Sequence, residues 1–361
     1  MTSTAISPAP QKTTSARLPK WAPWALLGGS FLVSAAVFAF ANPTGDPADF
    51  NIALTVVFAA VIYMIATFAF SFIVESRRHA VDRLMTALVG TAFVIALLPL
   101  ISLLYTVVVN GLARFDGQFF SWSMRNVVGE GGGAIHAVYG TLLITLWAAI
   151  ISVPIGLMTS IYLVEYGDGK RLAKGITFLV DVMTGIPSIV AGLFIYSVFA
   201  LLIGPGTRMG IMGSLALSVL MIPVVVRGSE ELLRIVPNEL REASYALGVP
   251  KWLTILKVVL PTSIAGITTS VMLAIARVIG ETAPLLLTVG MVSGMNLNMF
   301  GGQMATLPVF SYMQAKYPGL PQDAFIDRAW ASALTLILIV MALNLIARII
   351  AKAFAPKTAG R

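Results

Sequence analysis

The chain has 361 residues and a net charge of +8, from 24 basic and 16 acidic side chains, and only 11% of its residues are charged. In soluble domains roughly a quarter of the residues are charged, so this chain has too few charges to cover a soluble surface. The hydrophobic content of 58% excludes disorder, and the lack of cysteine excludes disulfides and thiolate sites. We therefore expect a membrane protein whose basic excess lies beside the membrane.

Eight apolar runs approach the length of about 20 residues that a helix needs to cross the hydrocarbon layer. They cover residues 24–40, 52–74, 84–109, 138–164, 176–203, 211–226, 253–279 and 332–350. Backbone groups in lipid must be satisfied within the segment, and the strands of a barrel would be shorter and would alternate. The sequence therefore predicts an all-α polytopic membrane protein with about eight transmembrane helices.

The basic residues predict the orientation of these helices. If the N-terminus is cytoplasmic, the inside segments hold 17 basic residues and the outside loops hold 5, while Lys257 and Arg277 lie within the seventh run. This asymmetry favours eight spans with both termini in the cytoplasm. Residues 1–20 are rich in Ser, Thr, Pro and Ala and are predicted to be disordered. The first span is either a retained anchor or a cleaved signal, and its run of about 17 residues exceeds a typical signal core.

Two outer connections are long for a membrane bundle. Residues 110–137 contain three successive glycines at 131–133, which predict a flexible loop. Residues 280–331 contain an apolar run at 283–292, which is too short to span and predicts a re-entrant or interfacial segment.

The inside connection at residues 228–252 predicts a short helix of about three turns. Pro237 and Asn238 are a typical helix start, and Gly248 and Pro250 are typical stops. The helix is amphipathic and is expected to lie across the cytoplasmic face.

This loop resembles the EAA motif of importer-type ABC permeases. The motif positions are filled, with Ser in place of the second Ala and Val in place of Ile, by Glu242, Ala243, Ser244, Gly248, Val258, Leu260 and Pro261. The resemblance implies a coupling helix that docks in a groove on an ATP-binding subunit. It implies that Glu242 offers a carboxylate to this partner, that Ala243 and Ser244 permit close approach, and that Gly248 allows a bend.

Further stretches, at residues 181–194, 227–237, 276–285 and 305–310, together resemble the PstA-type permease of the bacterial phosphate importer. The resemblance runs from about residue 84 to the C-terminus. It implies a six-helix, MetI-like permease domain at 84–355, two additional helices at 21–83, a tail at 356–361, and a location in the bacterial cytoplasmic (inner) membrane.

The resemblance implies transport roles for Arg277 and Arg227. Arg277 is expected near the outer end of the seventh span, where an unpaired cation costs at least about 2.5 kcal/mol on insertion scales. The planar fork of Arg suits phosphate because it can donate two hydrogen bonds to one anion. Glu281, four residues later, is expected to hold Arg277 when no phosphate is bound. The alternatives are a structural ion pair and an arginine that reaches the interface.

Glycine and proline within apolar segments are expected to loosen the backbone of a substrate-facing helix. The residues concerned are Gly185, Pro187 and Pro284. Asp181 would repel phosphate and is expected to pair with Lys174 or Arg171.

The chain lacks a Walker A sequence, so we expect no enzyme and no bound cofactor here, with ATP and Mg held by a separate ATPase. His79 and His136, the only histidines, fall on opposite sides, so no histidine metal cluster is expected. The resemblance implies that the chain works with a second homologous permease, two ATP-binding subunits and an extracytoplasmic phosphate-binding protein. The complex would move inorganic phosphate, the chain would contact membrane lipid, and no nucleic acid is expected as a partner.

Three alternatives stay open. One is an ABC permease for another oxyanion or a small polar solute. Another is a stand-alone secondary transporter, which would normally show two similar halves and would not need the EAA loop. The last is a membrane-embedded enzyme, which the shortage of buried nucleophiles and acid–base pairs disfavours.

Overall fold

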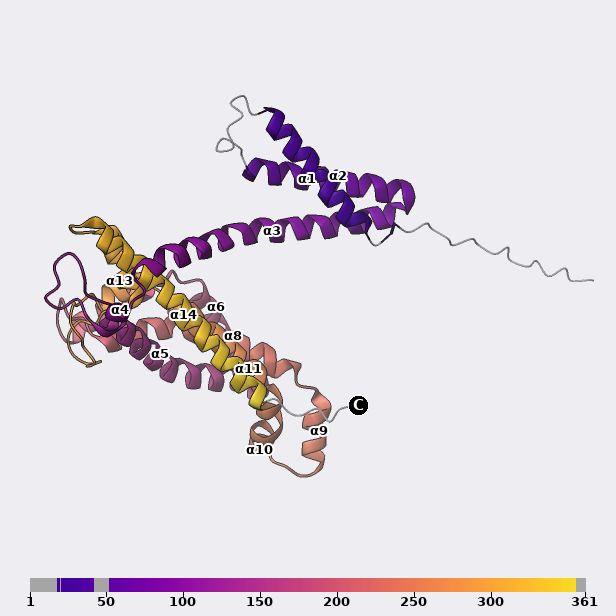
Figure 1. The fold of residues 1–361 in the computed structure, drawn as a ribbon. Helices are drawn as coiled ribbons and strands as arrows, with labels where there is room; N and C mark the ends of the chain where they lie inside the picture. Colours follow the sequence, from indigo (N-terminus) through magenta and orange to yellow (C-terminus); the bar gives the residue numbers. More distant parts are fainter. Residues whose placement is uncertain (1–17, 20, 42–51, 355–361) are drawn as a thin grey trace, which may run out of the picture. The chain divides into compact units, whose positions relative to one another are not determined.

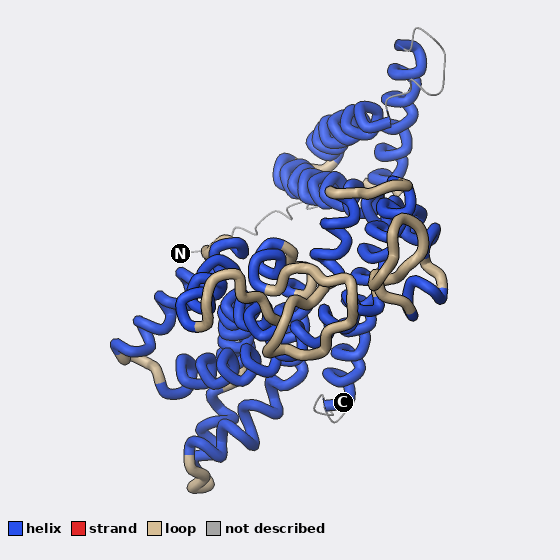
Figure 2. The backbone as a smooth tube through the Cα atoms, turned by 90° about the vertical axis from the view of Figure 1, so that its left-hand side faces the viewer, coloured by secondary structure: helices blue, strands red, loops and turns tan. Residues whose placement is uncertain are grey.

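The computed structural model describes residues 18–19, 21–41 and 52–354, and helices are the only regular elements within these ranges (Figure 1, Figure 2). Most of the stretch predicted to be disordered, and the predicted tail at 356–361, lie outside the described residues. The chain divides into two compact units, one up to Leu104 and one from Tyr105. Helix α3 (Arg77–Gly111) contributes to both units, and the boundary predicted at residue 84 lies within it.

The first unit contains α1 (Ala22–Ala41) and α2 (Ile52–Val74), which pack against each other. Small polar side chains lie in this contact. Ser34 Oγ donates a hydrogen bond of 2.7 Å to the carbonyl of Thr55, and Ser30 is buried one turn earlier. Small residues allow two apolar helices to approach closely, and hydrogen bonds between them add to the packing.

Glu75 connects the end of α2 to the start of α3. Its side chain is 2% exposed and accepts hydrogen bonds from Ser71 Oγ (2.6 Å), the Leu18 amide (2.8 Å) and Arg83 Nη2 (2.8 Å). Burial opposes ionisation of this carboxyl, but the three hydrogen bonds and the charge of Arg83 outweigh burial and lower its pKa from 4.5 to about 2. The ionised carboxylate therefore stabilises this turn at neutral pH.

The second unit is a helical bundle around α8. Its elements in chain order are the end of α3, the 3-10 turn η2 (Leu112–Arg114), α4 (Gly117–Ser121), α5 (Ile135–Ile161), the π turn η3 (Tyr162–Tyr166), α6 (Arg171–Thr184), α7 (Ser188–Leu202), α8 (Gly210–Ile235), α9 (Asn238–Ala246), α10 (Lys251–Thr254), the π turn η4 (Ile255–Val259), α11 (Leu260–Val278), α12 (Ala283–Thr288), α13 (Leu307–Lys316) and α14 (Gln322–Phe354). Helix α8 packs against α5, α6, α7, α11 and α12.

Helices α5 and α8 run parallel and share the core of this unit. Ser214 Oγ donates to the carbonyl of Ile144 (3.0 Å), while Ser218 Oγ donates to the carbonyl of Ser214 within α8 (2.7 Å) and lies 3.4 Å from the carbonyl of Ala148. Apolar side chains around these bonds are fully buried, and they include Leu217, Met221, Val225 and Ala274. Small hydroxyl residues thus bring the two helices close together, as in other membrane bundles.

In the described ranges, seven helical segments are long and apolar enough to cross a membrane, and the fifth predicted span is broken. The sequence predicts one helix at 176–203, but the structure has α6 and α7, bent by 107°. The break follows from Pro187, which has no N–H to donate and disfavours a helical conformation in the residue before it. The prediction of one continuous helix here was wrong, and the pair counted as one span makes eight.

The apolar run at 283–292 folds back into the bundle. It begins with α12, in which Pro284, Leu285 and Thr288 are buried. The carbonyl of Thr288 accepts a hydrogen bond of 3.2 Å from the amide of Met209. Pro284 occupies the first turn, where its missing N–H costs little. It therefore begins a helix rather than loosening one, contrary to the expectation from the sequence.

The loop that contains Gly131 is held by a buried arginine. Arg328 of α14 is fully buried, and its Nη1 donates to the carbonyls of Gly129 (2.8 Å) and Gly131 (2.9 Å), while Nε donates to Gln314 Oε1 (3.1 Å). These hydrogen bonds attach the loop to α14, and the sequence does not predict them because backbone carbonyls that accept from a distant side chain leave no pattern in it.

Replacing Glu75 with Gln should destabilise the α2–α3 turn by about 1–3 kcal/mol, because hydrogen bonds to a charged group are stronger than those to a neutral one. Since the folded pKa is lowered, the stabilisation is complete above pH 4.5 and is lost as the pH falls towards about 2. Hydrogen exchange of the turn amides across an acid titration measures this. Asp82→Asn is the control, because Asp82 is exposed on α3. Equal exchange in both variants would contradict the role of Glu75.

Gly140→Ala should cost about 1–3 kcal/mol, because the added carbon would overlap the carbonyl oxygen of the buried residue Ala305. Gly175→Ala on α6 is the control, since its added carbon would meet nothing within 4 Å. The thermal midpoints of the purified variants in detergent measure the difference. A Gly140 variant as stable as the Gly175 variant would contradict this close approach.

Candidate substrate cavity and coupling surface

Helices α8 and α11 run antiparallel, and their contacts locate Arg277. Two contacts give the register, namely Gly228 with Ser270 and Leu232 with Gly266. Continued along both helices, this register places Arg277 beside Met221, half-way along α8. The sequence predicts Arg277 near the outer end of its span. The helical stretch from α10 through α11 has 28 residues, which makes it about 42 Å long and longer than the ~30 Å hydrocarbon layer. The place of Arg277 near the end of this stretch therefore does not by itself put it at the membrane surface.

Arg277 lines a cavity of about 260 Å³. The cavity lies at the break between α6 and α7 and extends to the middle of α8 and the end of α11. Its lining residues are Met183, Thr184, Ile186, Pro187, Ser188, Leu220, Pro223, Val224, Arg277 and Glu281. Three residues singled out in the sequence, namely Arg277, Glu281 and Pro187, therefore come together here.

Arg277 and Glu281 share this cavity without forming an ion pair in the described structure. Helix α11 ends at Val278, and the amide of Glu281 donates to the carbonyl of Val278 (3.1 Å) in the turn that follows. The sequence predicts that the two side chains face each other over one helical turn, but this geometry requires both residues to be helical. The predicted tether is therefore not formed.

Arg227 has two carboxylate partners. Its guanidinium forms an ion pair with Asp181 of α6 and another with Glu230 Oε2 (2.9 Å), while Arg234 pairs with Glu230 Oε1 (2.9 Å). Asp181 therefore pairs with Arg227, and the predicted pairing with Lys174 or Arg171 was wrong. Arg227 therefore joins α6 to α8, and it does not line the cavity that contains Arg277; its transport role stays a prediction.

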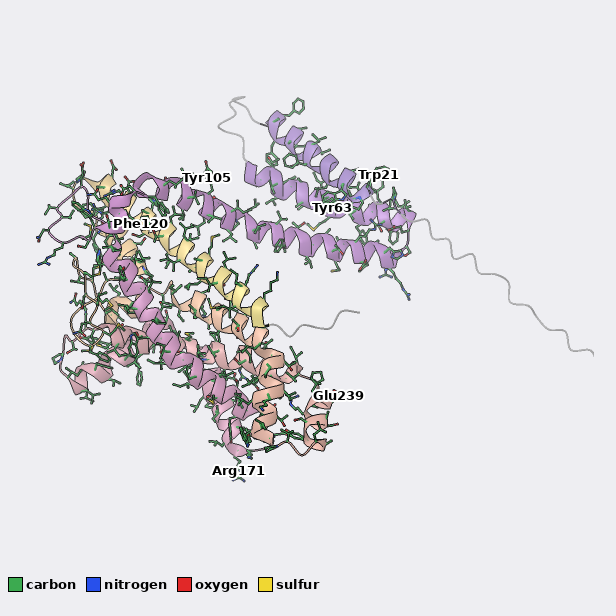
Figure 3. The ribbon with its side chains drawn as sticks, turned by 60° about the horizontal axis from the view of Figure 1, so that its bottom comes forward. Trp21, Tyr63, Tyr105, Phe120, Arg171 and Glu239 are labelled. Carbon is green, nitrogen blue, oxygen red and sulfur yellow. The ribbon has the colours of Figure 1, made fainter. Side chains whose placement is uncertain are left out.

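The predicted amphipathic helix is present as α9. It follows Pro237 and ends at Leu247, and Gly248 then takes a φ of +76°. Figure 3 shows Arg171 and Glu239 at the same end of the second unit, with Phe120 at the opposite end. We refer to the former as the α9 end.

The two faces of α9 differ. Glu242, Ala243 and Leu247 are exposed, and Leu247 retains 84% of its accessible surface. Ser244 is buried, and its Oγ forms a hydrogen bond of 2.8 Å with Thr254 Oγ1 of α10. The sequence predicts that Ser244 approaches a partner closely, but the structure places it inside the loop. Leu247 was missed as an exposed apolar side chain because its position relative to the buried face depends on where the helix ends.

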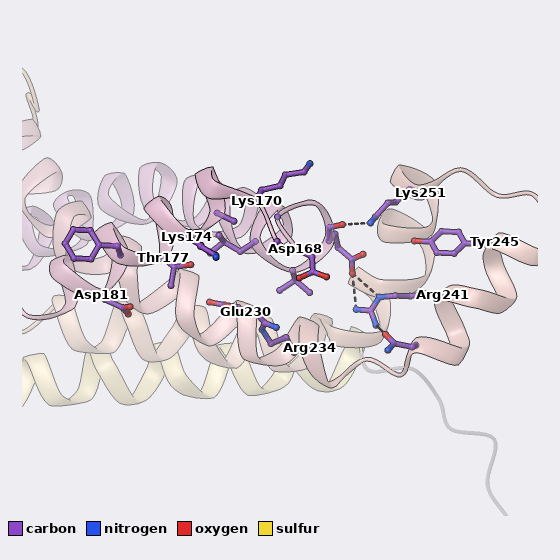
Figure 4. A pocket seen from close by; sticks show the side chains of 18 residues that line it. Asp168, Lys170, Lys174, Thr177, Asp181, Glu230, Arg234, Arg241, Tyr245 and Lys251 are labelled. Atoms are coloured by element: carbon purple, nitrogen blue, oxygen red, sulfur yellow. Dashed lines mark hydrogen bonds and ion pairs between the residues drawn. The ribbon is translucent and has the colours of Figure 1, made fainter.

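A larger cavity of about 860 Å³ lies at the α9 end, between η3, α6, α8 and α9 (Figure 4). Charged side chains of both signs line it, and Arg241 of α9 pairs with Glu165 of η3 at 3.0 Å. Burial raises the pKa of Tyr245, with a further increase from the Glu165 carboxylate and an opposing effect of Arg241. Glu165 and Arg241 were not singled out in the sequence, where each is an ordinary charge beside an apolar run.

Among the residues with a described position, no group of three or more His, Asp and Glu side chains could hold a metal ion. His136 is buried beside the ring of Phe310, with ring centroids 5.4 Å apart.

Residues 152–360 match the family described as "Binding-protein-dependent transport system inner membrane component". The chain is 47% identical over 277 residues to the "Phosphate transport system permease protein PstA 1" of Mycobacterium tuberculosis, covering 76% of this chain and 90% of that protein. It is 36% identical over 276 residues to the "Phosphate transport system permease protein PstA" of Yersinia pestis, covering 76% and 92%. A solved chain of a bacterial alginate ABC transporter has the same fold, with a TM-score of 0.53, 12% identity, and coverage of 76% of this chain and 96% of that one.

Gly248→Ala should cost about 1–2 kcal/mol, because an L residue at φ +76° is strained even though nothing lies within 4 Å of the added carbon. Gly248→Asn should cost less, since Asn tolerates this conformation. Thermal unfolding of the two variants tests the order. An equal loss of stability in both variants would show that the added side chain, and not the strained backbone conformation, causes the loss.

Proposed function

The chain belongs to the family of PstA-type permeases, and on this premise we propose that it is the transmembrane permease subunit of an ATP-driven phosphate importer. In this role it forms half of the translocation pathway, and its function is transport, with ATP hydrolysis carried out elsewhere. The identity of 47% to a PstA permease, extending over 76% of the chain, supports phosphate over another oxyanion or a small polar solute. The exposed face of α9 supports an ABC permease over a stand-alone secondary transporter, which would need no such surface.

The position of Arg277 is the observation that supports phosphate as the substrate. It lies half-way along the bundle and lines a cavity, and it forms no side-chain hydrogen bond or ion pair within the described chain. A cation at this depth is costly and is retained where it serves a substrate or ion pathway. Its guanidinium can donate two parallel hydrogen bonds to one phosphate, which a solvated lysine cannot do with the same geometry.

Glu281 gives this cavity a compensating charge. Because the carboxylate lies in the same cavity as Arg277, an entering phosphate meets a site of low net charge. Conduction requires binding that is strong enough for entry and weak enough for release. Glu281 therefore favours transient binding, and most selectivity would lie in the binding protein that delivers phosphate.

The remaining parts of the complex follow from the coupling surface. Glu242 and Ala243 on the exposed face of α9 would dock on an ATP-binding subunit, with Gly248 ending the helix. The complete importer would contain a second homologous permease, two ATP-binding subunits that hold ATP and Mg, and an extracytoplasmic phosphate-binding protein. The chain would lie in the bacterial cytoplasmic membrane with both termini and α9 in the cytoplasm, as the distribution of basic residues favours.

Arg277→Ala should reduce phosphate-stimulated ATP hydrolysis and uptake by the reconstituted complex about 10-fold to 100-fold, because charge-assisted hydrogen bonds to phosphate are lost. Lys257→Ala is the matched control, because Lys257 is an exposed cation on the same helical stretch and does not line the cavity. Stimulation of ATP hydrolysis in the wild-type complex by sulfate in place of phosphate would overturn the assignment of phosphate as the substrate. Equal activities of the Arg277 and Lys257 variants would overturn the role of the arginine.

A further inference from the structure

We propose that Arg241 and Glu165 form the link through which movement of α9 reaches the membrane helices. Arg241 is then a positioning residue for transport. The inference rests on the proposed function, because it names the contact by which a partner ATPase would act on the substrate cavity.

Arg241 uses nearly all of its donors within the protein. Its Nε donates to Glu165 Oε1 (3.0 Å), and its Nη2 donates to the carbonyl of Leu233 (2.9 Å). Its Nη1 donates to the carbonyl of Val236 (2.6 Å) and to Asn238 Oδ1 (3.2 Å). The side chains of Arg241 and Glu165 are only 11% and 4% exposed. An ion pair so far removed from water is screened much less than a pair on the surface.

These bonds join three elements. Arg241 belongs to α9, Glu165 belongs to the π turn that continues α5, and Leu233 lies in the last turn of α8. The last carbonyls of a helix have no partner within the helix, so a guanidinium that donates hydrogen bonds to them both caps α8 and fixes α9 to it. A displacement of α9 must therefore move the ends of α5 and α8 or break a buried charge pair, which is strongly unfavourable.

A second contact holds the other end of the coupling loop to the same place. Lys251 Nζ of α10 donates to the carbonyl of Glu165 and lies 5.0 Å from the centroid of the Tyr166 ring. Ser244 of α9 is bonded to Thr254 of α10 (2.8 Å). The loop is thus attached to η3 through both α9 and α10, and these two helices are bonded to each other.

The path from this link to the cavity is short and lies within one helix. Val224 of α8 lines the cavity with Arg277, and Leu233 of the same helix accepts the hydrogen bond from Arg241. Gly156 of α5 lies against Val225 of α8, next to the cavity-lining Val224, so α5 and α8 are in close contact at the level of the cavity. A rigid helix that contacts both sites is a physical route for coupling.

The pair of Arg234 and Glu230 provides a matched contrast. It has a similar distance of 2.9 Å and lies at the same end of α8, but both residues belong to α8 and Arg234 is 62% exposed. Loss of this pair removes a charge contact without disconnecting two elements.

The test uses the complete complex in liposomes and measures phosphate imported per ATP hydrolysed. The variants are Arg241→Gln, Glu165→Gln, the double variant and Arg234→Gln. We expect each single variant of the Arg241–Glu165 pair to lower this ratio at least about fivefold, with hydrolysis persisting. The double variant should be no worse than the worse single variant, because both changes remove one link. Arg234→Gln should keep the wild-type ratio.

Arg241→Lys guards against failure to fold, because it keeps the positive charge and loses the planar fork that holds the carbonyls of Leu233 and Val236. An assembled Arg241→Lys complex with a lowered ratio supports the link. Wild-type ratios in all variants, equal loss in Arg234→Gln, or failure of both Arg241 variants to assemble would overturn it. A wild-type complex that imports no phosphate would instead overturn the proposed function.

Discussion

The close contact between α5 and α8 is the feature on which the rest of the second unit depends. Ser214 Oγ of α8 donates to the carbonyl of Ile144 of α5, and Val225 lies against Gly156. Small residues at this contact let two helices approach closely in apolar surroundings. With α8 placed in this way, Val224 near its middle lines the cavity that contains Arg277, and Leu233 near its end accepts a hydrogen bond from Arg241. The candidate substrate cavity and the surface proposed for coupling therefore both contact α8, at two levels.

The basic excess of the chain divides into groups with different physical tasks. Arg227 is neutralised by two carboxylates and joins helices, and Arg328 is buried among backbone carbonyls and holds a loop. Arg277 lines a cavity without a partner among the described residues, which is the arrangement that an anion pathway needs. Charge type alone does not separate these roles, because a guanidinium can serve each of them and its partners decide which one it serves.

Much of the fold could be predicted because membrane helices obey local rules. The second predicted span, 52–74, coincides with α2, and α9 lies where the helix start and stop residues place it. The expectation of one continuous helix at 176–203 failed because apolar length was allowed to outweigh Pro187, whose effect on the helix is also local. Of the candidate site, Arg277 and Glu281 were found, but their pairing was mispredicted because it assumed that α11 continues past Val278.

The sequence by itself determined the membrane class, the number of apolar segments, the short helix at α9 and the family, because length, hydropathy and motif spacing are properties of the chain. Only the tertiary structure decided which charges are paired, that Ser244 faces inward, and that Arg241 meets Glu165 across 76 residues of sequence. Such contacts depend on the register between helices, and this register is set by side-chain packing and by backbone acceptors that every residue type provides.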